Sequence, residues 1–392
     1  MVFKKLTWPF SFFFIVSAAA AVYRPYLVLY FQSLSLSGAE IGLLVGVAPL
    51  VMMVSLPLIT GIADRTNRHS FIMGLSLLVV VLGLVLFPTF KTFILLFFLV
   101  VLVSIFLSPV FPLANNATMI MLGEQKDLYG RIRVGGTIGF SIAAAVAGIL
   151  VENFGLKIAF WSAAVLYLVA FFVNQKLTHQ EGVGGNLPDR GRVKDLLKNP
   201  RFLILLLIGF AGGISYASNN TYLFPYLKEL GAEESIMGLA LTIGTIAEIP
   251  VLFFVSRFIK RFNSYAVLIF STVMTSLRFL LLVLASNPTF VLGVQLLHGF
   301  THPLLSVAGV TYADEQAPVG FRATAQGLFN AAMGGIGAAF GGFVGGLLFG
   351  RMGGKGMYLA FCIFVLLILG LVSLLPRILP SRSETKSISE SG

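Results

Sequence analysis

Cysteine, histidine and charged residues are all scarce in this sequence. Cysteine occurs once, as Cys362, and histidine four times in 392 residues. A single cysteine excludes an intramolecular disulfide, and no Cys/His spacing matches a metal site. Charged residues make up 11% of the chain and apolar types 57%, whereas soluble domains carry far more charge. These proportions exclude a water-soluble globular protein, and we expect lipid to solvate much of the surface.

The sequence also lacks the signatures of enzymes and of nucleic-acid binders. It contains no phosphate-binding loop, zinc motif or Ser/His/Asp constellation, so we expect no catalytic group, cofactor or metal. The glycines at 334–337 and 341–346 fall inside an apolar run and indicate close helix contacts. A net charge of +11 would favour nucleic acid in a soluble protein. Here the basic residues lie between apolar runs, so they are expected to orient the chain in a membrane.

Apolar runs of about twenty residues predict twelve transmembrane helices. The first run is too long for the core of a signal peptide and is expected to stay as a helix. The predicted spans are 6–32, 39–62, 71–89, 92–118, 133–151, 158–174, 201–227, 236–256, 265–285, 289–312, 323–349 and 355–376. Twelve spans place both chain termini on one side of the membrane.

The distribution of basic residues between the spans predicts the orientation. Twenty Lys and Arg residues lie in segments on the side of the termini, and five lie on the other side. The termini are therefore expected in the cytoplasm, with the protein in the plasma (inner) membrane. A polar stretch at mid-chain predicts a division into two six-helix bundles, 1–175 and 200–379, with a linker 176–199 and a disordered tail 380–392. We expect the chain to act as a monomer.

An internal repeat supports this division. Shifting the chain by 196 residues aligns Tyr26 with Tyr222 and Gly42 with Gly238, among six identities in an eighteen-residue window. The two halves have the same topology, which is the parallel repeat of major facilitator halves.

The segment Gly61-Ile-Ala-Asp64-Arg65-Thr-Asn-Arg68, between the second and third spans, resembles the signature loop of the major facilitator superfamily. The glycine is expected to permit close helix approach. The aspartate can accept hydrogen bonds from a helix terminus or from an arginine across the bundle. The alternative is an ordinary basic loop. The residues that this motif and the start of the fifth span assign to gating are Gly61, Asp64, Arg65, Arg68, Arg131 and Arg133.

Further segments resemble one branch of that superfamily, the phenylpropionate permease with lactose permease and the nucleoside–proton symporters. They include residues 129–140, Ala247-Glu248-Ile-Pro, Leu277-Arg278-Phe and Gln295-Leu-Leu-His298-Gly. The resemblance implies a secondary transporter for a sugar, nucleoside or aromatic acid, taken up with protons. It departs from lactose permease because the residues three positions after His298 and His302 are Thr301 and Leu305 and not glutamate, so that proton site cannot be carried over.

Four residues within the spans are candidates for proton coupling. Glu248 is the only acidic residue deep in a span, where a carboxylate is costly and usually faces a cavity or a partner. It is expected to carry the proton, with Arg278, His298 and His302 as the other members. The two histidines share one helix face. The alternative is a structural ion pair between Glu248 and Arg278 or a histidine.

Aromatic, amide and basic residues on the first, seventh and tenth spans predict the substrate site, because such groups stack on and hydrogen-bond a ring-bearing solute. They are Tyr23, Arg24, Tyr26, Tyr216, Asn219, Asn220, Tyr222 and His298. Two alternatives are that Arg24 snorkels to the outer surface and that some tyrosines are interfacial anchors. For the whole chain, the rival functions are an efflux antiporter and a non-transporting membrane sensor.

Overall fold

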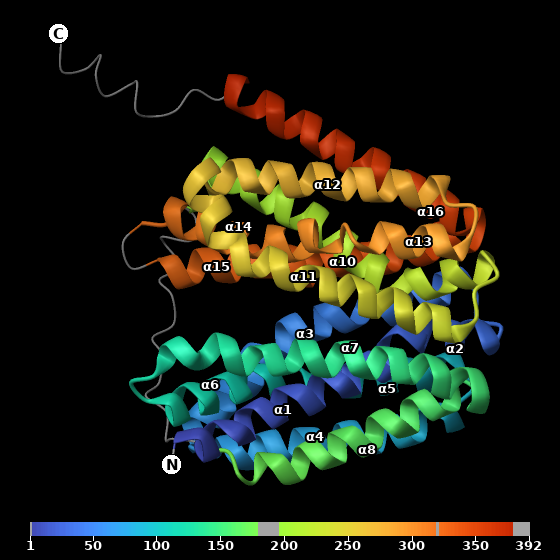
Figure 1. Ribbon diagram of the computed structural model, residues 1–392, viewed down its shortest axis with the longest axis vertical. Helices are drawn as coiled ribbons and strands as arrows, with labels where there is room; N and C mark the ends of the chain where they lie inside the picture. The colour runs from blue at the N-terminus through green and yellow to red at the C-terminus, as the bar shows by residue number, and fades with distance from the viewer. Residues whose placement is uncertain (1, 179–195, 319–320, 379–392) are drawn as a thin grey trace.

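The computed structural model describes residues 2–178, 196–318 and 321–378, which are almost wholly helical (Figure 1). The α-helices in chain order are α1 (Val2–Tyr23), α2 (Leu27–Ser33), α3 (Gly38–Thr66), α4 (His69–Leu86), α5 (Phe93–Leu107), α6 (Val110–Leu122), α7 (Tyr129–Phe154), α8 (Lys157–Asn174), α10 (Pro200–Glu229), α11 (Glu234–Phe262), α12 (Ser264–Leu284), α13 (Pro288–Gln295), α14 (His302–Gln316), α15 (Arg322–Asn330) and α16 (Ala338–Ile378). Shorter elements join them: the 3-10 turns η1 (Arg24–Tyr26), η2 (Phe87–Thr89), η3 (Lys126–Leu128) and η4 (His298–Phe300), and the π-helical η5 (Ala331–Gly337).

The described helices account for the predicted membrane spans. Ten are long and apolar enough to cross a bilayer, and the pair α13–α14, bent by 48°, adds an eleventh. One of the ten, Arg322–Leu374, is 53 residues long and would measure about 80 Å, more than twice the hydrocarbon thickness. Gly353 breaks it with a φ of 68°, so this segment supplies two spans. The predicted all-α membrane fold is confirmed.

Two spans are broken at the positions of candidate site residues. Pro25 cannot donate a helical hydrogen bond, and the chain between α1 and α2 tightens into η1, which carries Arg24. Between α13 and α14 the chain passes through η4, which carries His298. Broken helices at membrane depth are tolerated where they face protein or a water-filled cavity, and they line the binding sites of many transporters.

The described helices form two groups that follow the order of the sequence. In Figure 1 helices α1–α8 form the lower group, the first half, and α10–α16 form the upper group, the second half. Across the boundary α3 packs against α16 and α7 packs against α11. The segment 179–195, which holds most of the predicted linker, and the predicted tail 380–392 lie outside the described residues.

The aligned glycines of the internal repeat lie in equivalent contacts between the halves. A Cβ atom at Gly42 on α3 would collide with the backbone carbonyl oxygen of Phe343 on α16. A Cβ atom at Gly238 on α11 would collide with the carbonyl oxygen of Ala144 on α7. Small residues let membrane helices approach this closely, so the repeat reflects two related helix crossings.

The backbone carries the same repeat at its turns. Asn67, after α3, has a φ of 54°, and Asn263, after α11, has a φ of 61°. Ser35 and Gly231, which are also 196 residues apart, have φ angles of 59° and 81°. Asparagine and glycine tolerate this left-handed region better than other residues.

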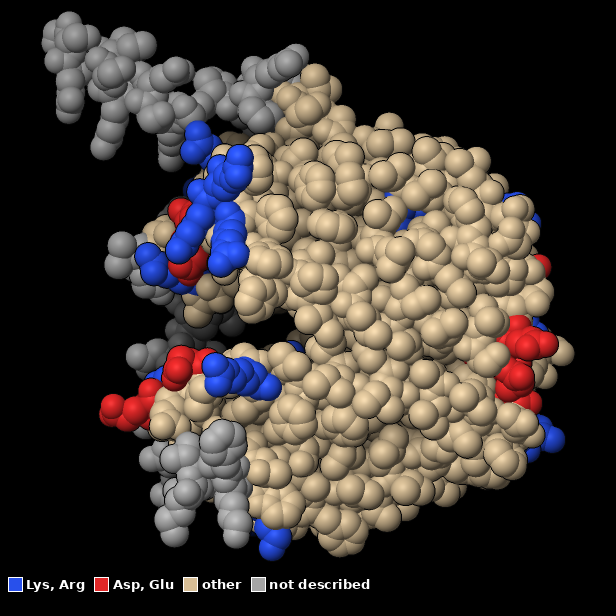
Figure 2. All heavy atoms as spheres, viewed as in Figure 1, with Lys and Arg blue, Asp and Glu red and all other residues tan. Residues whose placement is uncertain are grey.

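The two halves are closed together at one end of the molecule and separated at the other. Figure 1 shows both described chain ends at one end, here called the terminal face. Towards the opposite face, the backbone N–H of Ser235 donates to Glu152 at 3.0 Å, and the Thr242 hydroxyl donates to the backbone oxygen of Ser141 at 2.9 Å. Figure 2 shows a hollow between the halves at the terminal face, with Lys and Arg gathered around it.

Candidate functional site

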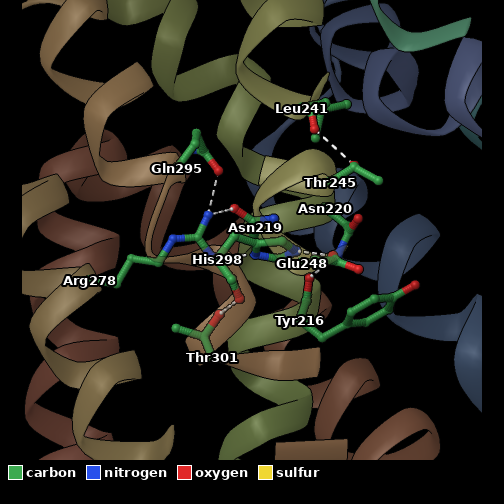
Figure 3. A network of polar contacts seen from close by, with 10 residues as sticks. All are labelled: Tyr216, Asn219, Asn220, Leu241, Thr245, Glu248, Arg278, Gln295, His298 and Thr301. Atoms are coloured by element: carbon green, nitrogen blue, oxygen red, sulfur yellow. Dashed lines mark hydrogen bonds and ion pairs between the residues drawn. The ribbon is translucent and has the colours of Figure 1, made fainter. Parts of the chain in front are cut away.

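Arg278 is the centre of a buried polar network in the second half (Figure 3). It lies on α12 and is 3% exposed. Its Nη2 donates to the amide oxygen of Asn219 at 2.5 Å and to that of Gln295 at 2.6 Å, and its Nη1 lies 2.7 Å from Nδ1 of His298. The helices α10 and α13 and the turn η4 are thus joined to α12 by one guanidinium, whose planar set of donors suits several acceptors at once.

The network continues from His298 to Glu248. The Nε2 atom of His298 lies 2.8 Å from Oε1 of Glu248, and the two side chains are 11% and 23% exposed. A guanidinium only donates hydrogen bonds, so Nδ1 of His298 must accept from Arg278. A neutral imidazole with an accepting Nδ1 carries its hydrogen on Nε2, which therefore donates to Glu248. Contact with Arg278 thus holds His298 in one neutral tautomer.

Close packing between α11 and η4 positions this pair. A Cβ atom at Gly299 would lie 2.5 Å from the backbone oxygen of Ala247, the residue before Glu248. At Gly244, one turn earlier on α11, a Cβ atom would lie 3.3 Å from the Gln295 side chain. Glycine at both positions lets the broken span approach α11 closely enough for the histidine to reach the carboxylate.

Glu248 marks the side of the network that faces the first half. In Figure 3, Tyr216, Asn220 and Glu248 lie on the side of the network towards the helices drawn in blue, away from Arg278. All three are partly exposed, whereas Asn219 is buried against Arg278. The ring of Tyr216 packs on that of His302 with centroids 4.5 Å apart. These groups offer a carboxylate, an amide and an aromatic surface to a solute between the halves.

The first half contributes Arg24 and Tyr23 to the same region. Nε of Arg24 donates to the Tyr23 hydroxyl at 3.4 Å. The Tyr23 ring packs edge-on against that of Tyr167, with centroids 6.4 Å apart. The guanidinium is also within electrostatic range of the hydroxyls of Tyr167 and Tyr216. The turn η1, which carries Arg24, packs against α10 of the second half, where Tyr216 lies.

Tyr23 is 4% exposed, and two further tyrosines of the predicted substrate site are also buried in packing. Tyr26 is 1% exposed, and its ring packs against Phe224 across the two halves at 4.9 Å. The Tyr222 hydroxyl donates to the backbone oxygen of Gly342 at 2.5 Å, and its ring stacks on Phe349. Neither ring presents surface to a solute in this conformation.

The predicted gating loop is fixed by a contact within the first half. Oδ1 of Asp64 lies 2.8 Å from Nε2 of His69, a residue 2% exposed at the start of α4. The aspartate therefore bonds a side chain of the next helix and not an arginine of the other half. A Cβ atom at Gly61 would meet nothing within 4 Å, so the close approach predicted for this glycine is not made in this conformation.

The arginines assigned to gating lie at the terminal ends of α3 and α7 or in the loop after α3. The guanidinium of Arg133 lies over the rings of Phe13 and Phe111, at 5.0 Å and 5.6 Å from their centroids. Cation–π contacts of this kind hold a cation at a helix surface. The residues that are exposed are Arg65, Arg68, Arg131 and Arg133.

Two residues of the site were not assigned to it from the sequence. Gln295 accepts from Arg278 and is 0% exposed, and the sequence signal for it was its position three residues before His298 on one helix face. Tyr167 is the only tyrosine of α8 and lies near the middle of that span, which is the signal that could have identified it.

Comparison with known proteins identifies the family. The model of the MFS_1 like family matches residues 7–360. The chain belongs to this family. It is a multi-pass membrane transporter of the major facilitator type and not an enzyme, as the sequence predicted.

Its relatives include proteins named as permeases and transporters. The chain is 29% identical over 364 residues to a maltose permease of Geobacillus stearothermophilus, covering 92% of this chain and 91% of that one. It is 26% identical to a putative nucleoside transporter of Escherichia coli, covering 81% and 78%. A crystal structure of a variant of the nucleoside transporter NupG has the same fold, with a TM-score of 0.86, 18% identity and coverage of 95% and 99%.

Proposed function

We propose that this protein takes up a sugar or a nucleoside together with a proton, by alternating access between its two halves. The names of its relatives support the solute class. The observation that carries the proposal is the chain of hydrogen bonds from Arg278 through His298 to the partly exposed Glu248.

Glu248 is the proton site in this proposal. Protonated histidine donates from both ring nitrogens, so a proton on His298 would break its bond with Arg278. Glu248 has no such constraint, because its side chain is partly exposed and a carboxylate can bind a proton directly. His302, which packs on Tyr216, and Arg278 are the other ionisable groups near the carboxylate. Arg278 thereby fixes His298 as a hydrogen-bond donor to Glu248, and Glu248 is the proposed site of the proton.

The observed conformation fits one step of such a cycle. The halves are separated at the terminal face, where a solute and a proton would leave after uptake. We place the terminal face in the cytoplasm of the inner membrane because of the excess of basic residues there. A single chain contains both halves of the site, so the transporter is proposed to work as a monomer. Asp64 and His69 would hold the loop after α3 during the exchange between states.

Replacement of Glu248 by glutamine tests the proposal. Glutamine mimics the protonated acid in shape and cannot titrate. In proteoliposomes, Glu248→Gln is expected to abolish accumulation driven by a pH gradient while retaining exchange of labelled for unlabelled solute. Accumulation at the wild-type level would show that the proton binds elsewhere. Loss of both activities in a folded variant would show that the carboxylate binds the solute only.

A further inference from the structure

Arg24 is a cation inside the membrane region without an anionic partner. A guanidinium has five N–H donors, yet its one hydrogen bond to the described residues is the 3.4 Å contact with Tyr23. Each ion pair between described residues involves other side chains. An unpaired charge at membrane depth is costly and usually marks a path for an ion or a solute.

Arg24 lies at the boundary between the two halves. It belongs to η1, where α1 is broken, and η1 packs against α10, the helix of the second half that carries Tyr216. As a residue, Arg24 is partly exposed. The halves are closed towards the opposite face by the contact of Glu152 with Ser235. Arg24 is therefore a partly exposed charge at the boundary between the halves, and Glu248 belongs to the other half.

The charges around this space do not balance. Arg278 and an ionised Glu248 compensate one another through His298, which Arg278 holds neutral. Arg24 remains with one positive charge that no described side chain neutralises. A carboxylate carries one negative charge and matches the planar guanidinium with two parallel hydrogen bonds. A phosphate monoester carries more negative charge than one arginine can balance.

We propose that the transported solute is a sugar or nucleoside that bears a carboxylate, and that this carboxylate binds Arg24. This inference rests on the proposed transport function and narrows its substrate class. The ring of the solute would lie against Tyr216, with its hydroxyls near Asn220 and Glu248. Arg24 and Glu248 would thus bind the solute from opposite halves, which couples its binding to their relative position.

The proposal has an electrical consequence. One carboxylate on Arg24 and one proton on Glu248 carry opposite charges, so they cross the membrane together without net charge. Uptake should then respond to a pH gradient and not to a potassium–valinomycin potential. A neutral solute moving with one proton would carry one positive charge and would respond to both.

Matched pairs of neutral and acidic compounds test the inference. We expect purified protein to bind at least one of glucuronate, maltobionate and orotidine at least ten times more tightly than its neutral counterpart, glucose, maltose or uridine. Arg24→Gln should remove this preference and Arg24→Lys should keep part of it. Arg351→Gln, at an exposed position on the opposite face, is the matched control and should keep the full preference.

The outcomes separate the two levels of the proposal. If the neutral member of each pair bound more tightly and Arg24→Gln did not change this, the proposal that a solute carboxylate binds Arg24 would be wrong. The proposal of proton-coupled transport would be unaffected. Absence of binding and uptake for all six compounds would count against both proposals. Thermal stability without solute supplies a second test, because removing an unpaired charge should raise the melting temperature. A lower melting temperature with unchanged preference would make Arg24 a structural residue and overturn the inference.

Discussion

The hydrogen bond between Arg278 and Gln295 should contribute measurably to the stability of the second half. The two side chains are 3% and 0% exposed, and the donor and acceptor lie 2.6 Å apart. Buried hydrogen bonds to a charged group contribute about 1.5–3 kcal/mol each. Arg278→Met removes such bonds to Gln295, Asn219 and His298, but it also removes the cost of burying the guanidinium. We therefore expect Arg278→Met to lower the free energy of unfolding by about 3–5 kcal/mol.

A double-mutant cycle isolates the bond. Gln295→Leu alone leaves one guanidinium donor unpaired and should lower the free energy of unfolding by about 1–3 kcal/mol. The double variant Arg278→Met with Gln295→Leu has no guanidinium and therefore no unpaired donor. Its loss of unfolding free energy should be smaller than the sum of the two single-variant losses by about 1.5–3 kcal/mol. The free energy of unfolding can be measured by titration with sodium dodecyl sulfate in detergent micelles.

Ser55→Ala, in the first half, supplies the control for this cycle. Combined with Gln295→Leu it should give losses that add within about 0.5 kcal/mol, since distant sites are independent. The stability losses of Arg278→Met and Gln295→Leu could instead add as fully as those of the control pair. In that case the hydrogen bond would not contribute to stability, and the proposed anchoring of the network would be wrong.

Three further predictions concern orientation and the conformational cycle. Cysteine at Lys228 should react in intact cells with an impermeant thiol reagent, and cysteine at Lys260 should not; the reverse pattern would overturn the orientation. Gly42→Ile should expose the path at the opposite face and slow uptake, because a side chain there collides with α16. Gly370→Ile has open space and should leave uptake unchanged, and equal effects of the two variants would contradict the closed contact. Asp64→Asn should slow solute exchange and leave the equilibrium affinity for solute intact, since Asp64 contacts the start of α4 and not the solute region. A loss of affinity would refute the gating role of Asp64.

Hydropathy was sufficient to predict the spans because a bilayer forces backbone groups into helices. Each predicted apolar run corresponds to a described helical segment, and Gly353 separates the last two. The break between α5 and α6 at Ser108 and Pro109 was not predicted. Proline is tolerated inside other helices of this chain, such as Pro225 in α10, so its presence alone does not indicate where a span bends.

The candidate site was only partly predictable from sequence. Glu248 was identified because an acid deep in a span requires a partner or a cavity. Its partner was left open between Arg278 and a histidine, and the structure places both in series, with His298 between them. Tyr216 and Tyr222 have the same chemistry, yet one is partly exposed and the other buried. That difference depends on the rotation of α10, which the sequence pattern does not define.

The proton flux that accompanies solute entry tests the central claim most directly. Proteoliposomes containing wild-type protein and an internal pH indicator should acidify when solute is added, at a fixed ratio of protons to solute. Glu248→Gln should admit solute down its gradient with no acidification. Acidification by the Glu248→Gln variant at the wild-type ratio would contradict the assignment of Glu248 as the site that binds the coupled proton.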